Sequence, residues 1–501
     1  MLPIKAAVIL FLLPFLSVTC NADPDSAKAA YKSGDYKTAI PLLRAAVAQD
    51  AKDPILCADL LSALVYEGQV DEASDLEETA LAQFPNSPEA IAARGEFFFY
   101  MGDLGQAETL FRAAIRLKDD TPRAVFGMYR VCRAVSMYRK ARLLCLKAHE
   151  TDPDDARITV AWLPYLMPEK RKELLGPFVK AHPWFYKRFE ENTQTETDVR
   201  HQLNEKEEFQ LEGPKQETTL SMVYLMNGPN YIRGVGLRVA IEGGKPLNLL
   251  FDTGASGILL NQAAVDKAGL AHVGSFQING IGDKGMRNSF ATVAEDCTIG
   301  TLKFKNCVFG ATEGKGKVGG EEDGLIGADF FSDYVIGIDF QKRLLHLKPQ
   351  PERDPNPQGY DRTVPRDETD FTPVLRFGHH LFVTTKVNGK STGLFLLDTG
   401  ASLSTMDSTF ARLSTKIHGD DYMRVHGVSG EVKNVFEAEK AELQFAHFRQ
   451  HNLGLTSFDL NNLPEHQEVR MAGILGMPVL ALFRLTIDYR NGLVNLDYIK
   501  K

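Results

Sequence analysis

Two copies of the tripeptide Asp-Thr-Gly are the residues of this chain best suited to chemistry. They occur at Asp252-Thr253-Gly254 and Asp398-Thr399-Gly400, within the matched segments LLFDTGASGILL and FLLDTGASLSTM. Ordinary composition gives about one chance Asp-Thr-Gly per ten chains of this length. Two copies in matched surroundings therefore predict two carboxylates delivered to one place. Such a pair shares a proton, so that one member can act as a base and the other as an acid towards water.

Three further landmarks follow each tripeptide in the same order: a glycine-bearing loop, an apolar-apolar-Gly run and a strand containing Ile-Asp. In the first copy they are Gly280-Ile281-Gly282, Gly324-Leu325-Ile326-Gly327 and Ile338-Asp339, and in the second Gly427-Val428-Ser429-Gly430, Gly473-Ile474-Leu475-Gly476 and Ile487-Asp488. From the tripeptides onward, corresponding landmarks are separated by 146, 147, 149 and 149 residues. This nearly constant offset predicts an internal duplication of a β-rich unit, with two related lobes between about residues 216 and 501.

On these motifs the chain resembles the pepsin-like and retroviral-type (retropepsin) aspartic proteases. In that superfamily each lobe supplies one Asp-Thr/Ser-Gly turn, a glycine-bearing flap and an apolar-apolar-Gly strand beneath the turn. The resemblance covers a little over half of the chain. It is closer to a retroviral-type dimer fused into one chain, because Ala255 and Ala401 stand where pepsin-like enzymes usually have Ser or Thr. Neither flap loop contains tyrosine, so pepsin-like substrate contacts are not implied.

The resemblance assigns expected roles to particular residues. Asp252 and Asp398 would be the catalytic pair. The turns would be completed by Thr253, Gly254, Thr399 and Gly400, and the flap candidates are Gly280, Gly282, Gly427 and Gly430. The ionised carboxylate would take a proton from water, and the protonated one would polarise the peptide carbonyl. No metal or other cofactor is required by this chemistry.

Two other interpretations of the tripeptides stay open at this point. Asp, Thr and Gly are common in ordinary strand-end turns, although matched flanks and spacing disfavour that reading. The second is a protease fold that has lost activity and only binds peptide. The intact pair Asp252 and Asp398 favours an enzyme over such a scaffold.

A second, independent repeat occupies the N-terminal part. Small residues recur every 34 positions, as shown by Gly34, Gly68, Gly102 and Ser136, by Ala39, Ala73, Ala107 and Ala141, and by Ala46, Ala80, Ala114 and Ala148. This period resembles the tetratricopeptide repeat, a helix–turn–helix unit in which alanine allows close helix crossing. About four units are expected over residues 24 to 155, the first abbreviated. Such an array offers a groove for a partner protein, and a packing-only spacer is the alternative.

The first 22 residues predict a secretory signal peptide. MLPIKAAVILFLLPFLSVTCNA has one Lys, an apolar stretch from Ala6 to Val18 and small polar residues after it. The stretch is short for a membrane span and contains Pro14, so no membrane span is expected in the mature chain. Cleavage after Ala22 indicates export to a periplasmic or extracellular space. A lipoprotein signal ending at Cys20 is the weaker alternative.

Composition limits the classes of function. The chain has 501 residues and a formal net charge of −8, which argues against nucleic acid as a main partner and shows no basic membrane-binding face. Five cysteines remain beyond Cys20, and sequence alone leaves open whether Cys297 and Cys307 pair. His379-His380 is expected in a surface or turn role rather than as a metal ligand.

These features predict a multidomain α + β protein: an N-terminal α-solenoid followed by a two-lobed all-β unit. The expected divisions are a signal peptide (1–22), repeats (23–155), a helical connector (156–215), lobe 1 (216–350), a Pro-rich linker (351–373) and lobe 2 (374–501). The expected function is that of an exported aspartic endopeptidase acting on a peptide or protein substrate. A narrower alternative is an enzyme that acts only on a partner delivered by the repeats.

Overall fold

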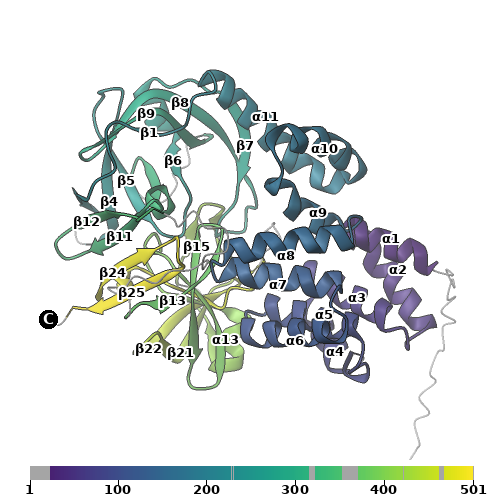
Figure 1. Cartoon of the computed structure of the whole chain (residues 1–501). Helices are drawn as coiled ribbons and strands as arrows, with labels where there is room; N and C mark the ends of the chain where they lie inside the picture. The colour runs from purple at the N-terminus through teal and green to yellow at the C-terminus, as the bar shows by residue number, and fades with distance from the viewer. Residues whose placement is uncertain are drawn as a thin grey trace, which may run out of the picture.

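The computed structural model describes residues 23–499 except 80, 227, 229–230, 315–321, 353–369, 421 and 462–467. The proposed signal peptide and most of the Pro-rich linker lie outside these residues. A helical array, coloured purple to blue in Figure 1, lies beside two β-rich lobes. The predicted class, an α-solenoid followed by a two-lobed all-β unit, is confirmed.

Four helix pairs form the array. Their bounds are α1 (Pro24–Ser33), α2 (Tyr36–Gln49), α3 (Pro54–Tyr66), α4 (Val70–Thr79), α5 (Pro88–Tyr100), α6 (Leu104–Leu117), α7 (Pro122–Ala134) and α8 (Tyr138–Thr151), with the short η1 (Leu81–Gln83). Each first helix of a pair begins with proline, which suits a first turn because its missing N–H has no helical partner. The alanines of the 34-residue period that the structure describes are at most 1% exposed, as close helix crossing requires.

The polypeptide continues through α9 (Ala156–Trp162), η2 (Leu163–Tyr165), α10 (Pro168–Ala181) and α11 (Pro183–Gln202). Helix α11 reaches lobe 1, where the hydroxyl of Thr195 donates to the carbonyl of Ser275 at 2.6 Å. Val199 and Leu203 pack there against Ala291. Among the described helices, none has both the length and the apolar character needed to cross a membrane.

Lobe 1 is a strongly curved sheet. Its elements are β1 (Gln210–Leu211), β3 (Val223–Met226), β4 (Ile232–Ile241), β5 (Leu247–Asp252), β6 (Ile258–Asn261), α12 (Gln262–Ala268), β7 (Gly274–Ile278), β8 (Arg287–Ile299), β9 (Leu302–Thr312), β10 (Gly324–Gly327) and η3 (Ala328–Phe331). The strand order is β1-β9-β6-β10-β5-β4-β8-β7, and β8 also pairs with β9. A disulfide joins Cys297 to Cys307 across this β8–β9 hairpin.

Lobe 2 repeats this plan. Its elements are β14 (Leu375–Phe377), β15 (His380–Val387), β16 (Ser391–Leu397), β17 (Thr405–Asp407), α13 (Ser408–Ser414), β18 (Ile417–Gly419), β19 (His426–Gly427), β20 (Gly430–Glu431), β21 (Phe436–Phe445), β22 (Phe448–Phe458), β23 (Gly473–Leu475) and α14 (Met477–Leu480). In both lobes the apolar-apolar-Gly strand lies parallel to the strand that precedes the tripeptide, β10 beside β5 and β23 beside β16.

A third sheet is built by both lobes together. Its order is β13 (Thr372–Pro373), β25 (Leu493–Tyr498), β24 (Phe483–Asp488), β11 (Tyr334–Asp339), β12 (Leu344–Pro349) and β2 (Thr218–Ser221). The two Ile-Asp strands, β11 and β24, are direct antiparallel neighbours at its centre, with Ile336 opposite Ile487. The duplicated strands are thus the hydrogen-bonded junction between the lobes.

One hydrophobic cluster joins the array to lobe 2. Its members include Ile91, Phe99, Leu104, Phe111 and Val131 from the helices and Phe382, Leu394, Leu396, Val469 and Ile474 from the lobe. Polar contacts accompany it: the backbone N–H of Arg470 donates to the carbonyl of Tyr100 at 2.7 Å. The array therefore shares a core with lobe 2 and is not a separate appendage.

Gly102 is expected to be intolerant of a side chain because of this junction. It adopts φ +85°, and a methyl group built on it would lie 2.9 Å from Cγ of Leu394. Gly68 occupies the same repeat position with φ +70°, but its nearest neighbour would be the hydroxyl of Tyr100 at 3.7 Å. Alanine costs backbone strain at both sites, so Gly68→Ala is a matched control. We expect Gly102→Ala to lower the free energy of unfolding by about 1–3 kcal/mol more than the control in urea titrations. Equal losses would contradict a tight junction.

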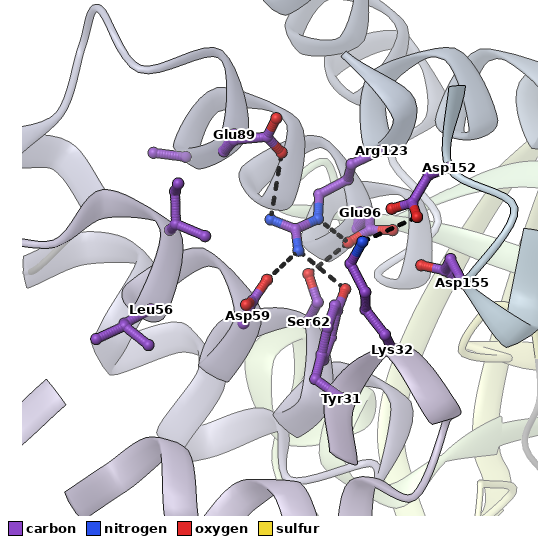
Figure 2. A network of polar contacts seen from close by, with 12 residues as sticks. Tyr31, Lys32, Leu56, Asp59, Ser62, Glu89, Glu96, Arg123, Asp152 and Asp155 are labelled. Carbon is purple, nitrogen blue, oxygen red and sulfur yellow. Dashed lines mark hydrogen bonds and ion pairs between the residues drawn. The ribbon is translucent and has the colours of Figure 1, made fainter. Parts of the chain in front are cut away.

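A buried polar network joins the first helices of the array (Figure 2). The guanidinium of Arg123 on α7 bonds to Tyr31 on α1 at 3.0 Å and to Asp59 on α3 at 2.5 Å. It also lies 3.5 Å from a carboxylate oxygen of Glu96 on α5. Arg157 on α9 reaches the same tyrosine at 2.8 Å. The first helices of successive pairs thus converge on one buried polar network.

Candidate active site

The two Asp-Thr-Gly turns meet at the junction of the lobes. Asp252 ends β5, and Asp398 follows β16, with its backbone N–H donating to the carbonyl of Leu475 at 3.1 Å. A methyl group built on Gly254 would lie 2.8 Å from Cγ of Asp398, and one on Gly400 would lie 2.4 Å from Cγ of Asp252. Each glycine is therefore needed so that the opposite carboxyl group can approach its backbone.

Thr253 and Thr399 hold the turns together by reciprocal hydrogen bonds. The hydroxyl of Thr399 accepts from the N–H of Thr253 at 3.1 Å, and the hydroxyl of Thr253 accepts from the N–H of Thr399 at 3.0 Å. Each hydroxyl also donates across the junction, to the carbonyl of Leu397 at 2.7 Å and to that of Phe251 at 2.8 Å. Both threonines are fully buried, so these bonds have no competition from water.

The reciprocal hydrogen bonds of Thr253 and Thr399, here called the threonine lock, should weaken when one of the two hydroxyls is removed. Thr253→Val keeps the shape but leaves the buried carbonyl of Leu397 and the N–H of Thr399 without their partner. We expect a loss of about 1–3 kcal/mol in the free energy of unfolding, measured with urea. Thr253→Ser retains the hydroxyl and is the control, and a valine variant as stable as the serine variant would disprove the role of the lock.

The two carboxyl groups accept different numbers of backbone hydrogen bonds. Asp398 accepts from the N–H groups of Gly400 at 2.8 Å and Ala401 at 2.9 Å, and Asp252 accepts from that of Gly254 at 2.7 Å. Burial and the charge of Asp398 raise the pKa of Asp252 well above its usual value. Burial also raises the pKa of Asp398, but the hydrogen bond from Asp252 and the two backbone donors oppose it. The pair therefore titrates as a unit, with its shared proton favoured on Asp252.

One cation faces the pair from β4. The charge of Arg233 opposes the rise in pKa of both Asp252 and Asp398. Its own side chain is fixed by Glu322, with Nε donating to the carboxylate at 2.9 Å. No motif in the sequence identified Arg233, because its neighbours resemble any other strand.

The predicted flap glycines come together in a contact between the lobes. The loop between β7 and β8 carries Gly280 and Gly282, and the turn between β19 and β20 is bounded by Gly427 and Gly430. The N–H of Ser429 donates to the carbonyl of Ile281 at 3.0 Å, and the N–H of Lys284 donates to the carbonyl of Ser429 at 2.9 Å. The two loops are thus joined backbone to backbone.

The tips of these loops lie near the Asp-Thr-Gly turns in a crossed arrangement. Val428 from lobe 2 belongs to a hydrophobic cluster with Ala255 of the lobe 1 turn. Ile281 from lobe 1 belongs to a cluster with Ala401 of the lobe 2 turn. The predicted flaps and turns therefore form one assembly.

His379 and His380 lie at a turn, in agreement with the surface or turn role expected from the sequence. His379 lies in the turn between β14 and β15, His380 begins β15, and both are half-buried. Nε2 of each ring lies within hydrogen-bonding distance of the carbonyl oxygen of Gly254. The sequence did not predict this contact, because strand spacing does not reveal that the hairpin crosses to the other lobe. Among the described residues, no group of three or more His, Cys, Asp or Glu side chains is placed to hold a metal ion.

Comparison with known families agrees with the two-lobe plan. An aspartyl protease family model matches residues 237–330 and 383–479, one segment for each tripeptide. A tetratricopeptide repeat model matches residues 30–97. The crystal structure of an aspartic proteinase from Irpex lacteus shares 14% identity, covers 57% of this chain and 98% of that protein, and gives a TM-score of 0.35. No curated protein matches the chain.

The chain thus matches the aspartyl protease family model in two segments and the tetratricopeptide repeat model in one, in line with the resemblances that the sequence motifs indicated. The family matches support a protease of the aspartic kind in general terms.

Proposed function

We propose that this protein is an aspartic endopeptidase with a single active site formed by Asp252 and Asp398. The observation that carries the proposal is the approach of each carboxyl group to the glycine of the opposite turn. The reciprocal threonine lock fixes that approach. An amide is a poor electrophile, so its hydrolysis needs both a base for water and an acid for the carbonyl and the leaving nitrogen.

The asymmetry of the backbone donors suggests the role of each carboxyl group. Asp398 accepts more backbone N–H donors, which favours its ionised form. Asp398 would therefore take the proton of the attacking water while Asp252 gives its proton to the peptide carbonyl oxygen. In the resulting diol, Asp398 would pass its proton to the nitrogen as the C–N bond breaks, and Asp252 would recover its proton. The joined flaps would exclude bulk water during these steps.

Cleavage of a diverse peptide mixture tests this proposal. The full chain is incubated with the peptides and new termini are identified by mass spectrometry, with the Asp252→Asn/Asp398→Asn double variant as control. We expect new termini only with the wild-type chain. If the wild type yields none while still retaining peptides, the chain is the catalytically silent binding scaffold instead.

The pKa directions predict the pH range of activity. The acid limb of the rate profile would report protonation of the ionised carboxylate, and the alkaline limb would report loss of the shared proton. Burial raises the pKa of both groups, so both limbs should move to higher pH than for unperturbed carboxyls. We expect kcat/KM to peak in mildly acidic solution. A maximum in strongly acidic solution would contradict these directions.

We also infer that the protein is exported. The N-terminal 22 residues carry the signal-peptide pattern, and the Cys297–Cys307 disulfide suits an oxidising compartment. The tetratricopeptide repeats indicate a protein-interaction unit. We propose that its first partner is lobe 2 of the same chain, because the shared hydrophobic cluster fixes the two together. An external substrate or partner protein would then meet exposed helix faces, since the first helices bury these polar side chains against one another.

A further inference from the structure

The carbonyl oxygen of Gly254 lies beside two histidines from the opposite lobe. Its distance is 3.3 Å from Nε2 of His379 and 3.2 Å from Nε2 of His380. The ring centroids of these histidines are 3.9 Å apart. A carbonyl oxygen has two lone pairs, so it can accept from both rings when each carries its proton on Nε2. Lobe 2 therefore holds the turn that presents Asp252 through these two hydrogen bonds.

The hairpin that carries the histidines is itself fixed. Arg376 on β14 donates from Nε to the carbonyl of Gly378 at 2.8 Å and from Nη1 to that of Tyr489 at 2.8 Å. Its guanidinium lies over the ring of Tyr489 at 5.3 Å and that of Tyr138 at 5.9 Å. Tyr138 begins α8, so the helical array and lobe 2 both hold the hairpin. A rigid support is what precise placement of a catalytic turn requires.

Lobe 1 makes a corresponding contact in the other direction. The hydroxyl of Tyr231, which precedes β4 as His379 precedes β15, donates to the carbonyl of Ser402 at 3.2 Å. Ser402 follows the Asp398 turn. Each lobe therefore reaches across to the turn of the other, but only the lobe 2 contact uses imidazole rings, which can take up a second proton.

Charged groups surround the histidines, and the protonation state of the two rings affects the carboxyl pair. Burial lowers the pKa of both rings, that of His380 to about 4, and the neighbouring His379 adds to this effect on His380. The groups that face His379 are Asp329, Asp252 and Arg376. An added proton would sit on Nδ1, leaving the Nε2 donor in place but bringing positive charge to the turn of Asp252. That charge would favour ionised Asp252 and so oppose retention of the shared proton.

We propose that His379 and His380 are positioning residues that hold the Asp252 turn from lobe 2 and keep the carboxyl pair in its singly protonated state while both rings are neutral. This inference rests on the proposed peptidase function. It extends that function by making activity depend on residues that act through the Asp252 turn. It also ties the site to the helical array through Tyr138 and Arg376.

Activity of paired variants tests the catalytic part. His379→Leu/His380→Leu removes both donors, and we expect kcat to fall about 10- to 100-fold with KM changed by less than about threefold. His379→Gln/His380→Gln keeps a side-chain N–H that cannot be protonated further. It should recover most of kcat and extend the acid limb of kcat to lower pH. His418→Leu, which alters an exposed histidine paired with Glu439, is the control.

The NMR signal of the Gly254 carbonyl carbon tests the contact between the histidines and the Asp252 turn without any substrate. The dipeptide Gly-Ala occurs four times, at 254–255, 310–311, 327–328 and 400–401. Labelling glycine with 13C at the carbonyl and alanine with 15N therefore limits the spectrum to the carbonyl signals of these four glycines. Gly254 is one of them, and Gly400 serves as an internal reference. We expect the carbonyl shift of Gly254, and not that of Gly400, to change in the double leucine variant and during acid titration of the wild type.

The outcomes distinguish failure of the proposed peptidase function from failure of the inference about the histidines. An unchanged Gly254 signal together with wild-type kcat in the double leucine variant would overturn the inference. Failure of the glutamine variant to recover kcat would show that ring packing, and not N–H donation, supports the turn, which would also overturn it. A wild-type chain that cleaves no peptide would overturn the proposed function and the catalytic consequence, whereas the carbonyl signal would still decide whether the histidines hold the turn.

Discussion

Replacing either Asp252 or Asp398 by asparagine is expected to lower kcat/KM about 10³-fold or more. Each carboxyl group needs the other in the opposite protonation state, and an amide can neither take the proton of water nor hold the shared proton. Progress curves with a fluorogenic peptide chosen from the cleavage experiment would measure the loss. Comparable losses in both single variants are expected, because the pair acts as a unit. Near-full activity in either variant would disprove a shared site.

The stability of these variants provides the control for folding. Folding raises the pKa of both carboxyls, so the pair contributes stability below its unfolded pKa and loses it as the pH rises through the folded pKa. At neutral pH the asparagine variants should therefore be at least as resistant to urea as the wild type. In mildly acidic solution that difference should shrink. An inactive variant that was also much less stable would leave its activity loss attributable to misfolding.

Much of the site could be predicted from the sequence because it is encoded locally and twice. Asp252 ends a strand and Asp398 directly follows one, and apolar residues of these strands, such as Phe251 and Leu397, are fully buried. The constant offset between the copies then required related lobes. The flap glycines followed for the same reason, since Gly282 and Gly430 adopt positive φ in turns that favour glycine.

Contacts between units could not be predicted in this way. His379 and Arg233 belong to ordinary strand ends, and only the assembled lobes bring them towards the carboxyl pair. The helical repeat was equally clear in sequence, yet its 34-residue period says nothing of the polar network between its helices. Arg123 and Asp59 are 64 residues apart and meet only in the stacked helices.

Replacing Arg123 by methionine is expected to cost about 3–5 kcal/mol in the free energy of unfolding. The guanidinium is surrounded by carboxylates from α3 and α5, and its side chain is only 7% exposed. Without it Asp59 and Glu96 would remain buried with one cation fewer, and water could not replace the lost bonds. Figure 2 shows how Glu89, Glu96 and Asp59 converge on this one side chain.

An exposed ion pair in the same array gives the matched control. Arg44 bonds to Glu72 at 2.5 Å, but both side chains are 44% exposed, so Arg44→Met should cost at most about 1 kcal/mol. Trp162 on α9 stacks on His149 of α8, so its fluorescence reports unfolding of the helical part in urea. Adding Asp59→Leu to Arg123→Met should cost less than the two single losses combined, because the double variant leaves one fewer unpaired carboxylate. Equal effects of Arg123→Met and Arg44→Met would show that the buried network adds no more to the stability of the array than an exposed ion pair does.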